Sequence, residues 1–427
     1  MKVLVVGKGG REHALVWKLA QSPRVTKVYC APGNAGTALE GENVSIDVNE
    51  FDKLIRFAKK NAVGLTVVGP EDPLASGIVD SFHKSGLRIF GPSKEAARIE
   101  ASKVFSKRLM RHADVPTAEF AVFDHPQPAR DWAGSRDYPL VVKADGLAAG
   151  KGVLVCSDGE EARKAIERIM TREEFGARTG RQVVIEKRLE GEELSLFALV
   201  SARTILLLPA TQDHKPVFDG DKGPNTGGMG AYCPAPKGTS ELVRLAERDV
   251  FVPIVHAMKR GRFPFKGLLY AGLMLTNQGP RVLEFNARFG DPETQPLLMR
   301  LKSDLLDLLE AVVDERLGDL PEGALVWDER PAVCIVLASG GYPGKYETGK
   351  LITGLDEAAK LRDVKVFHAG TKLNQGRVLT DGGRVLAVTA LGETLSDAKK
   401  RAYEAAAKIK FTGMHFRTDI ADKALKV

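Results

Sequence analysis

The chain has 427 residues, of which 44% are hydrophobic and 27% charged, and its formal net charge at pH 7 is +7. This length predicts about two to four domains, and the composition is typical of an ordinary globular protein. The modest positive charge suits an anionic small molecule or keeps the protein soluble. No block of five like charges occurs, which argues against a nucleic-acid partner.

Cysteine usage and hydropathy indicate a soluble protein of the cytoplasm. The cysteines are scattered and form no CxxC pair, which is typical of a reduced chain and not of a disulfide framework or zinc site. The N-terminal sequence MKVLVVGKGG has too short an apolar run for a signal peptide. No apolar segment of about 18 residues occurs, so we expect no membrane span.

Residues 1–93 alternate short apolar runs with helical patterns. Apolar residues recur at helical spacing in 12–21, 51–61 and 76–86. The runs VLVVG, KVYCA, GLTVVG and LRIFG are the expected strands, at 3–7, 27–31, 64–69 and 87–91. A strand–helix repeat of this kind predicts a parallel sheet covered by helices.

The remaining chain predicts further α/β units. A charged helical stretch is expected at 93–113. It is followed by expected strands at 119–123, 138–144, 152–156 and 182–189, with one helix at 160–170. Further strands and two helices, near 240–260 and 303–316, are expected between about 191 and 315. The turn-rich sequence GDLPEGA, at 318–324, marks a boundary before a last unit of three strands and a helix.

The sequence GKGGREHA, at 7–14, follows the first strand and opens a helix. A dinucleotide-binding fingerprint would need glycine where Glu12 stands, and an acidic residue about 20 residues later, where the second strand ends in CAPG. Two interpretations remain. The sequence is either a tight strand–helix turn or an anion site, made by the backbone N–H groups of Gly9 and Gly10 beside Arg11.

The sequence KADGLAAGKGV, at 143–153, is similar to a P-loop at first sight. The spacing does not match, because Gly146 and Gly150 are one residue too close and Gly152 follows Lys151 in place of Ser or Thr. We interpret it as a hairpin loop whose glycines and Lys151 close over phosphates, with Lys143 reaching them from the preceding strand. The alternative is a glycine-rich hairpin with a surface lysine.

The sequence EKRLEGEELS, at 186–195, carries Glu186, Leu189, Glu192 and Glu193. An edge segment of this kind can present backbone groups to an adenine, with a carboxylate a few residues later for the ribose hydroxyls. Taken alone, the same sequence is more typical of a solvated acidic turn.

The sequence QDHKPVFDGDKGPNTGGMGAY, at 212–232, combines many charged side chains with glycines. We expect a loop of about 20 residues without regular structure, and such loops are usually functional or disordered. Its balanced charges and its glycines, which allow close backbone approach, favour a substrate-binding loop.

The sequence VLEFNARFGDPE, at 282–293, places polar residues at the end of an apolar strand. Glu284 and Asn286 are two residues apart, so both side chains point to the same face of the strand. Carboxylate and carboxamide oxygens suit Mg²⁺ held by few protein ligands and by nucleotide phosphates. Arg288 can clamp a carboxylate or phosphoryl group. The alternative is a polar edge strand on a solvated face.

Nine motifs, in this order, resemble the phosphoribosylamine–glycine ligase family, ATP-grasp enzymes of purine biosynthesis. They are VLVVGKGGREHAL, APGNAGT, VVGPEDPLA, FGPSKEAARIEASK, VVKADGLAAGKGV, QDHKPVFDGDKGPNTGGMGAY, LEFNARFGDPETQPLL, ASGGYPGKYETG and HAGTK. The resemblance implies an α/β protein with an N-terminal βαβ domain, an ATP-grasp body with an inserted lid, and a C-terminal α+β domain. The expected limits are 1–101 for the N-terminal domain, 102–118 and 191–325 for the body, 119–190 for the lid, and 326–427 for the C-terminal domain.

The reaction implied by the resemblance joins glycine to 5-phosphoribosylamine and gives glycinamide ribonucleotide, ADP and phosphate. ATP phosphorylates the glycine carboxylate, and the amine then attacks the glycyl phosphate. No protein nucleophile is needed, so catalysis consists of positioning and charge neutralisation. His214 is either a general base or a hydrogen-bonding structural residue. We favour the structural role, because acyl-phosphate chemistry needs no histidine.

The resemblance also implies roles for individual residues. The ligands of Mg²⁺, or of Mn²⁺, are expected to be Glu284 and Asn286. The expected ATP contacts are Lys103, Lys143, Gly150, Lys151, Glu186, Leu189 and Glu193, with spacing favouring Glu193 over Glu192 for the ribose. The expected substrate contacts are Gly9, Gly10, Arg11, Glu12, Gly227, Gly228 and Met229. The residues expected to line the glycine and amine site, and to act in catalysis, are Asp213, Lys215, Arg288 and Asp291.

Two departures from the family pattern remove none of these residues. Lys8 stands where the family often has a small residue, and Pro216 and Val217 follow the DHK sequence in place of a more usual basic residue. We expect a monofunctional monomer that acts on small molecules only, with no membrane or nucleic-acid partner. A transient contact with the amidotransferase that supplies the amine is also expected.

Three other functions compete with this interpretation. Another ATP-grasp ligase, such as a carboxylase or transformylase, would share the metal pair and the lid but not the 212–232 sequence. A dinucleotide-dependent oxidoreductase is disfavoured by the missing third glycine. A catalytically silent nucleotide-binding regulator is disfavoured by the intact pair of Glu284 and Asn286.

Overall fold

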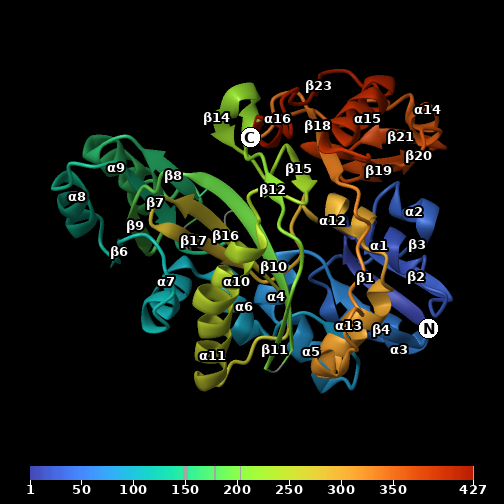
Figure 1. Cartoon of the computed structure of the whole chain (residues 1–427), viewed down its shortest axis with the longest axis horizontal. Coiled ribbons are helices and arrows are strands. Elements are labelled where there is room, and N and C mark those ends of the chain that lie inside the picture. Colours follow the sequence, from blue (N-terminus) through green and yellow to red (C-terminus); the bar gives the residue numbers. More distant parts are fainter. Residues whose placement is uncertain (148–151, 177–178, 202, 427) are drawn as a thin grey trace.

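The computed structural model describes residues 1–147, 152–176, 179–201 and 203–426. Figure 1 shows a small unit of helices and strands that projects to the left, and an N-terminal unit at the lower right. A central sheet lies between them, and the C-terminal unit lies above the N-terminal one. In the described ranges, no helix is both long enough and apolar enough to cross a membrane.

The N-terminal unit is a parallel sheet in the order β3-β2-β1-β4-β5. Its strands are β1 (Lys2–Gly7), β2 (Lys27–Pro32), β3 (Glu42–Asn43), β4 (Val63–Val68) and β5 (Ile89–Phe90). The central strands carry nearly continuous buried apolar runs, as parallel strands covered on both faces do. The connecting helices include α1 (Gly10–Leu19), α3 (Phe51–Lys60) and α5 (Ile78–Lys84). The predicted parallel sheet is therefore confirmed.

The projecting unit is an antiparallel sheet in the order β6-β9-β7-β8 with a hydrophobic core of its own (Figure 1). Its strands are β6 (Phe120–Phe123), β7 (Leu140–Ala144), β8 (Val153–Cys156) and β9 (Val183–Lys187). Helices α8 (Pro126–Gly134) and α9 (Gly159–Ile166) pack on it through small residues such as Ala129, Ala133 and Ala162. The unit also contacts the rest of the chain through a small apolar cluster of Val104, Phe120 and Val184 and through the ion pair of Lys107 with Glu186.

The central sheet has the order β11-β10-β16-β17 and is antiparallel. Its strands are β10 (Glu192–Ser201), β11 (Thr204–Leu207), β16 (Gly267–Thr276) and β17 (Gly279–Asn286). The neighbouring helices are α7 (Lys103–His112), α11 (Val252–Arg260) and α13 (Leu305–Val313). β17 ends at Asn286, so the polar residues singled out in the sequence lie at the end of a strand of this sheet.

The segment 212–233 differs from the unstructured loop that we expected, and that expectation is wrong. It contains β12 (Gln212–Asp213), a hairpin of β13 (Pro216–Phe218) with β14 (Lys222–Asn225), and β15 (Gly230–Cys233). β12 pairs with β15, and β15 pairs with β18 (Ala332–Ser339). Strands this short carry no readable alternation, and their partner lies about a hundred residues later in the sequence.

The C-terminal sheet completes this pairing in the order β12-β15-β18-β22-β19. β19 (Val364–His368) and β22 (Arg384–Leu391) are its later strands, α15 (Leu395–Lys408) packs on β18 and β22, and β23 (Met414–His415) pairs with β18. The segment 212–233 is thus shared between the central and C-terminal units. The domain limits expected from the sequence stay a prediction.

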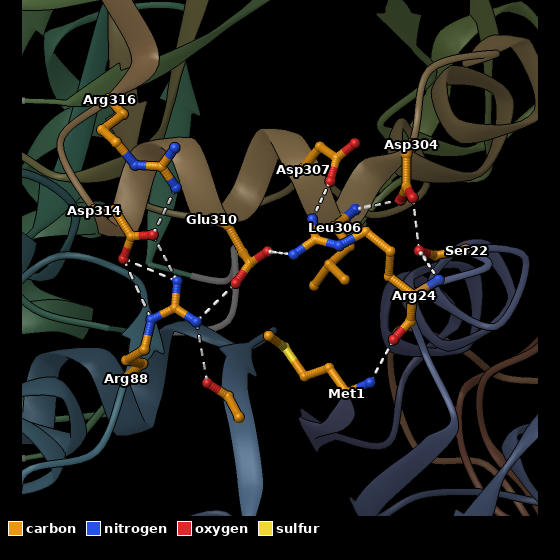
Figure 2. Close-up of polar contacts among 11 residues, drawn as sticks. Met1, Ser22, Arg24, Arg88, Asp304, Leu306, Asp307, Glu310, Asp314 and Arg316 are labelled. Carbon is orange, nitrogen blue, oxygen red and sulfur yellow. Dashed lines mark hydrogen bonds and ion pairs between the residues drawn. The ribbon is translucent and has the colours of Figure 1, made fainter. Parts of the chain in front are cut away.

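A network of charged residues joins the N-terminal sheet to α13 (Figure 2). The buried Glu310 carboxylate accepts from Arg88, at 2.7 Å, and from Arg24, at 2.6 Å. Arg88 also pairs with Asp314, and Ser22 donates to Asp304 at 2.6 Å. The N-terminal sheet is therefore fixed to the central unit on this side.

Candidate active site

A cavity of about 840 Å³ lies where the four units meet. Arg11, Glu71 and Glu100 enter it from the first hundred residues, and Lys143, Glu186 and Leu189 from the projecting unit. The central unit and the 212–232 segment contribute Lys103, Glu193, Asp213, Lys215, Asn225, Thr226, Gly227, Tyr270, Glu284, Asn286, Arg288, Asp291 and Glu293. The C-terminal unit contributes Tyr342, Pro343, Tyr346 and Arg384.

Glu284 and Asn286 both line this cavity from the end of β17, as the alternation of a strand predicts. β17 pairs with β16 so that Gly272 lies opposite Glu284 and Tyr270 opposite Asn286. Lys103 Nζ is 3.5 Å from the Glu284 carboxylate. Desolvation raises the pKa of Glu284, but neighbouring lysines, Lys103 first, outweigh it and lower the pKa to about 2. Glu284 is therefore ionised at neutral pH.

Glu186 lies at the centre of a buried group of charges. Lys107 Nζ is 2.6 Å from one carboxylate oxygen of Glu186, and Lys143 pairs with the other. Lys143 also donates to the Leu283 carbonyl at 3.1 Å, next to Glu284. Burial raises the pKa of Glu186, but the two lysines outweigh this and lower it. Two sequence-predicted residues, Lys143 and Glu186, are thus brought into direct contact.

The lysine loop that the sequence predicts lies partly outside the described residues. Gly150 and Lys151 belong to that part, so their interpretation stays a prediction. The flanking residues Gly146, Leu147 and Gly152 line the cavity beside Lys143.

Lys215 pairs with Glu193 inside the cavity. Its Nζ donates to the Glu193 carboxylate at 2.6 Å, so a residue predicted to contact the ribose touches one predicted to contact glycine. Burial lowers the pKa of Lys215, but Glu193 and then Asp213 raise it well above its ordinary value. Burial raises the pKa of Asp213 to about 7, although Lys215 acts in the opposite direction.

Arg288 is held between two carboxylates from the first hundred residues. Its guanidinium lies 3.0 Å from Glu100 and 3.2 Å from Glu71, and donates to Asn286 Oδ1 at 3.5 Å. Burial raises the pKa of Glu71, but Arg288 and Arg11 outweigh it and lower it to about 2. Arg288 therefore enters the cavity as an oriented cation beside Glu284 and Asn286.

The glycines at the start of α1 are only partly available to a ligand. The Gly9 N–H donates to the carboxylate of Glu12, which also accepts from Arg11 Nε at 2.5 Å. Glu12 is 2% exposed and caps the first turn of its own helix. The backbone N–H of Gly9 is therefore already hydrogen-bonded and is not free for a ligand. Of the four predicted residues at 9–12, Arg11 lines the cavity and donates to the Phe289 carbonyl at 3.1 Å.

Asp291 and the 227–229 stretch meet the C-terminal unit at Arg384. This guanidinium donates to the carbonyls of Gly227, at 2.8 Å, and Asp291, at 2.6 Å, and lies 3.3 Å from the Asp291 carboxylate. The Gly227 N–H donates to the Tyr342 hydroxyl at 3.1 Å. At Gly228, with φ +111°, an added Cβ would meet Pro292 at 2.4 Å. Met229 is instead buried in a small core with Val217 and Ala338.

Three family models of phosphoribosylglycinamide synthetase match consecutive parts of the chain. The N domain matches residues 1–100, the ATP-grasp (A) domain 101–294 and the C domain 332–423. The chain belongs to the phosphoribosylglycinamide synthetase family. This membership decides against a dinucleotide-dependent oxidoreductase.

Individual relatives agree with the family models along the whole chain. A phosphoribosylamine–glycine ligase of Rhodopirellula baltica is 55% identical over 429 residues, covering 99% of this chain and 98% of the relative. The crystal structure of a phosphoribosylamine–glycine ligase from Thermotoga maritima matches with a TM-score of 0.82 at 34% identity, covering 99% of this chain and 100% of that chain. The biotin carboxylase domain of a Hydrogenobacter thermophilus 2-oxoglutarate carboxylase, at 15% identity and a TM-score of 0.73 over 97% of this chain and 91% of that one, shares the fold.

Sequence reasoning missed several residues that line this cavity or pair with its lining residues. Lys107 is one of them, although it follows Lys103 by four positions on α7 and so shares its helix face. Glu71, Glu100, Tyr270, Tyr342, Tyr346 and Arg384 are also among them. The motif ASGGYPGKYETG was noticed, but nothing in its spacing connects Tyr342 with Gly227, which lies 115 positions earlier.

His214 does not have the hydrogen-bonding role that we favoured. The side chain is 1% exposed, and neither ring nitrogen has a hydrogen-bond partner among the described residues. Burial lowers the pKa of His214 to about 4, so the ring is neutral at pH 7. Its ring centroid lies 5.9 Å from that of Tyr232, and His214 is not among the residues that line the cavity.

Proposed function

We propose that this cavity joins glycine to 5-phosphoribosylamine at the expense of ATP, giving glycinamide ribonucleotide, ADP and phosphate in purine biosynthesis. The contact between Lys215 and Glu193 carries the proposal, because it links the nucleotide half of one enclosure to the acceptor half. A carboxylate oxygen of glycine attacks the γ-phosphorus, and ADP leaves. The amine then attacks the carbonyl carbon of glycyl phosphate, and phosphate leaves with release of a proton. The chain contributes positioning and fixed charge to both steps.

The nucleotide half extends from α7 to the projecting unit. Lys103 and Lys143 contact the phosphates of ATP, while Glu186 and the backbone at Leu189 receive the adenine. Glu193 accepts from the ribose hydroxyls. The support is that all five line the cavity, with Lys143 held in place by Glu186. Gly150 and Lys151 close over the phosphates, which rests on the sequence alone.

Glu284 and Asn286 are the protein ligands of Mg²⁺ or Mn²⁺. The donor set fits a hard divalent cation, because an ionised carboxylate and a carboxamide oxygen from one strand end line the same cavity. When bound, such an ion neutralises phosphate charge and polarises the phosphoryl group. Lys103 Nζ, 3.5 Å from the Glu284 carboxylate, holds that carboxylate in place at the cavity wall.

The acceptor half receives glycine and the phosphoribosylamine. Arg288 binds the glycine carboxylate and keeps it beside the metal pair, while Asp213, Lys215 and Asp291 surround the two amines. Arg11 contacts the phosphoribosylamine with Gly10, and the backbone at Gly227 and Gly228 closes the site. Gly9, Glu12 and Met229 hold the backbone of this half of the cavity in place. Charged groups of both signs in this half suit a zwitterion and an amine.

The enzyme works as a monomer in the cytoplasm, with the four domain limits expected from the sequence. Phosphoribosylamine is unstable, which favours a transient contact with the amidotransferase that produces it.

The test is ADP release from ATP and Mg²⁺ with glycine, with and without freshly generated phosphoribosylamine. Release that requires both substrates supports the proposed reaction. If neither substrate stimulates release, the proposed acceptor is wrong, and other carboxylates and amines should be screened.

A further inference from the structure

The C-terminal segment from His415 to Lys423 lies against the hairpin β13–β14 (Figure 1). We propose that this segment positions the hairpin, and that Arg417 is a positioning residue for the acceptor half of the cavity. The kinetic part of this inference rests on the proposed function, whereas the mechanical part does not.

Arg417 makes the central contacts. Its side chain is fully buried and donates to the Pro216 carbonyl and to the Asp221 carboxylate, both at 3.1 Å. Nε and Nη2 donate to the two oxygens of Asp419, each at 2.7 Å. A bidentate pair of this kind fixes the orientation of the guanidinium as well as its position.

A second layer of contacts surrounds Arg417. The Thr418 N–H donates to Asp219 at 2.8 Å, and the Gly220 N–H donates to Asp419 at 2.8 Å. Lys423 pairs with Asp221 at 2.5 Å. His415 lies 2.8 Å from the Val217 carbonyl oxygen and packs edge-on against the ring of Phe218. Each of the six residues from Pro216 to Asp221 therefore contacts the C-terminal segment.

The hairpin needs such support because it is a two-stranded sheet that pairs with no other strand in the described part of the chain. An isolated two-stranded hairpin is marginally stable in water. Five of the six contacted residues are at least partly exposed, so the hairpin has little hydrophobic core of its own. The C-terminal segment supplies the missing contacts.

The base of the hairpin lies in the cavity. Lys215 precedes β13, and Asn225, Thr226 and Gly227 end or follow β14; all four line the cavity. The Thr226 N–H and hydroxyl both bond the Lys215 carbonyl, at 2.8 and 2.7 Å. A displacement of the hairpin is therefore transmitted to Lys215, and misplacement of a reacting group by about 1 Å costs roughly 100-fold in rate.

Arg417→Met and Arg417→Lys test the proposal, with Arg300→Met as the matched control. Arg300 is also buried, at 6% exposure, and donates to the Arg330 and Asp328 carbonyls outside the hairpin. We expect Arg417→Met to lower kcat/KM for glycine roughly 10- to 100-fold. Arg417→Lys, which keeps the charge but loses the bidentate fork, should be intermediate.

Trypsin provides a readout that needs no catalysis. The exposed Lys222 lies in the hairpin before Gly223, whereas Lys215 precedes proline and resists cleavage. We expect native Arg417→Met to be cut after Lys222 faster than the wild type or Arg300→Met, with the fragments identified by mass spectrometry. If wild type shows no ligase activity, the proposed function fails, yet this cleavage still tests the positioning of the hairpin.

If Arg417→Met does not fold, the double variant Asp219→Asn with Lys423→Met is tested in its place. Both positions are exposed, and the two substitutions weaken the contacts between the hairpin and the C-terminal segment less severely. Faster cleavage with a smaller loss of kcat/KM for glycine supports the proposal. Two results would overturn it: resistance at Lys222 equal to that of the wild type, or a fall in kcat/KM for glycine no larger than that of Arg300→Met.

Discussion

Lys107 Nζ lies 2.6 Å from Oε2 of Glu186, and both side chains are almost fully buried. Burial lowers the pKa of Lys107 to about 8, although the carboxylate opposes the shift. Lys107 also donates to the Thr117 hydroxyl at 2.6 Å, and Thr117 bonds the Val282 carbonyl of β17. The pair thus connects the projecting unit, through Glu186 of β9, to the strand that carries Glu284.

Lys107→Met should destabilise the protein by about 3–5 kcal/mol, because Glu186 then keeps only one of its two buried cationic partners. The double variant Lys107→Met with Glu186→Gln should be more stable than Lys107→Met alone, since the uncompensated charge is gone. Urea unfolding of the four proteins in this cycle measures both effects. Additive losses would show that the two side chains do not interact.

Glu284→Ala should abolish turnover and leave the fold intact. The side chain faces the cavity and is 31% exposed, so its removal leaves no void in the core. Loss of charge stabilisation at a site of this kind costs at least roughly 100-fold in kcat. ADP release measures activity, circular dichroism measures the fold, and Mn²⁺ titration followed by electron paramagnetic resonance measures binding of the ion. A variant with normal activity would remove Glu284 from the metal assignment.

The affinity for glycine should depend on Asp213. Burial raises its pKa to about 7, so the carboxylate becomes predominantly ionised only as the pH rises through 7. If this anion attracts the glycine ammonium group, KM for glycine should fall between pH 6 and pH 8, and Asp213→Asn should remove that part of the pH dependence. An unchanged profile in Asp213→Asn would assign the titration to another group.

The same pKa has a consequence for stability. Asp213 is protonated more readily in the folded state than in the unfolded chain, where its ordinary pKa is 3.8. Its contribution to the free energy of unfolding is therefore fully present below pH 3.8 and is lost as the pH rises toward 7. Wild type should lose stability relative to Asp213→Asn across this window, as measured by urea midpoints at successive pH values.

Glu310→Gln should weaken the attachment of the N-terminal sheet without affecting the chemistry. The carboxylate is buried and bonded to Arg24 and Arg88 (Figure 2). Hydrogen bonds to charged groups contribute about 1.5–3 kcal/mol each, and the amide keeps only part of this. We expect a lower urea midpoint with unchanged KM for ATP and glycine. A changed KM would indicate that the attachment of the N-terminal sheet also shapes the cavity.

The sequence by itself determined the features that depend on local backbone geometry. The parallel N-terminal sheet followed from alternating apolar runs and helical spacing, and the shared cavity position of Glu284 and Asn286 followed from the two-residue period of a strand. Ordered motifs along the chain also indicated the family that the comparisons show.

Only the tertiary structure decided which distant residues meet. The contacts of Lys107 with Glu186, of Lys215 with Glu193, and of Arg384 with Asp291 join segments that no short-range pattern relates. The folding of 212–233 onto β18 depends on pairing with a strand about a hundred residues later. Periodicity is fixed by the bonds of neighbouring residues, whereas these contacts depend on how whole sheets pack against one another.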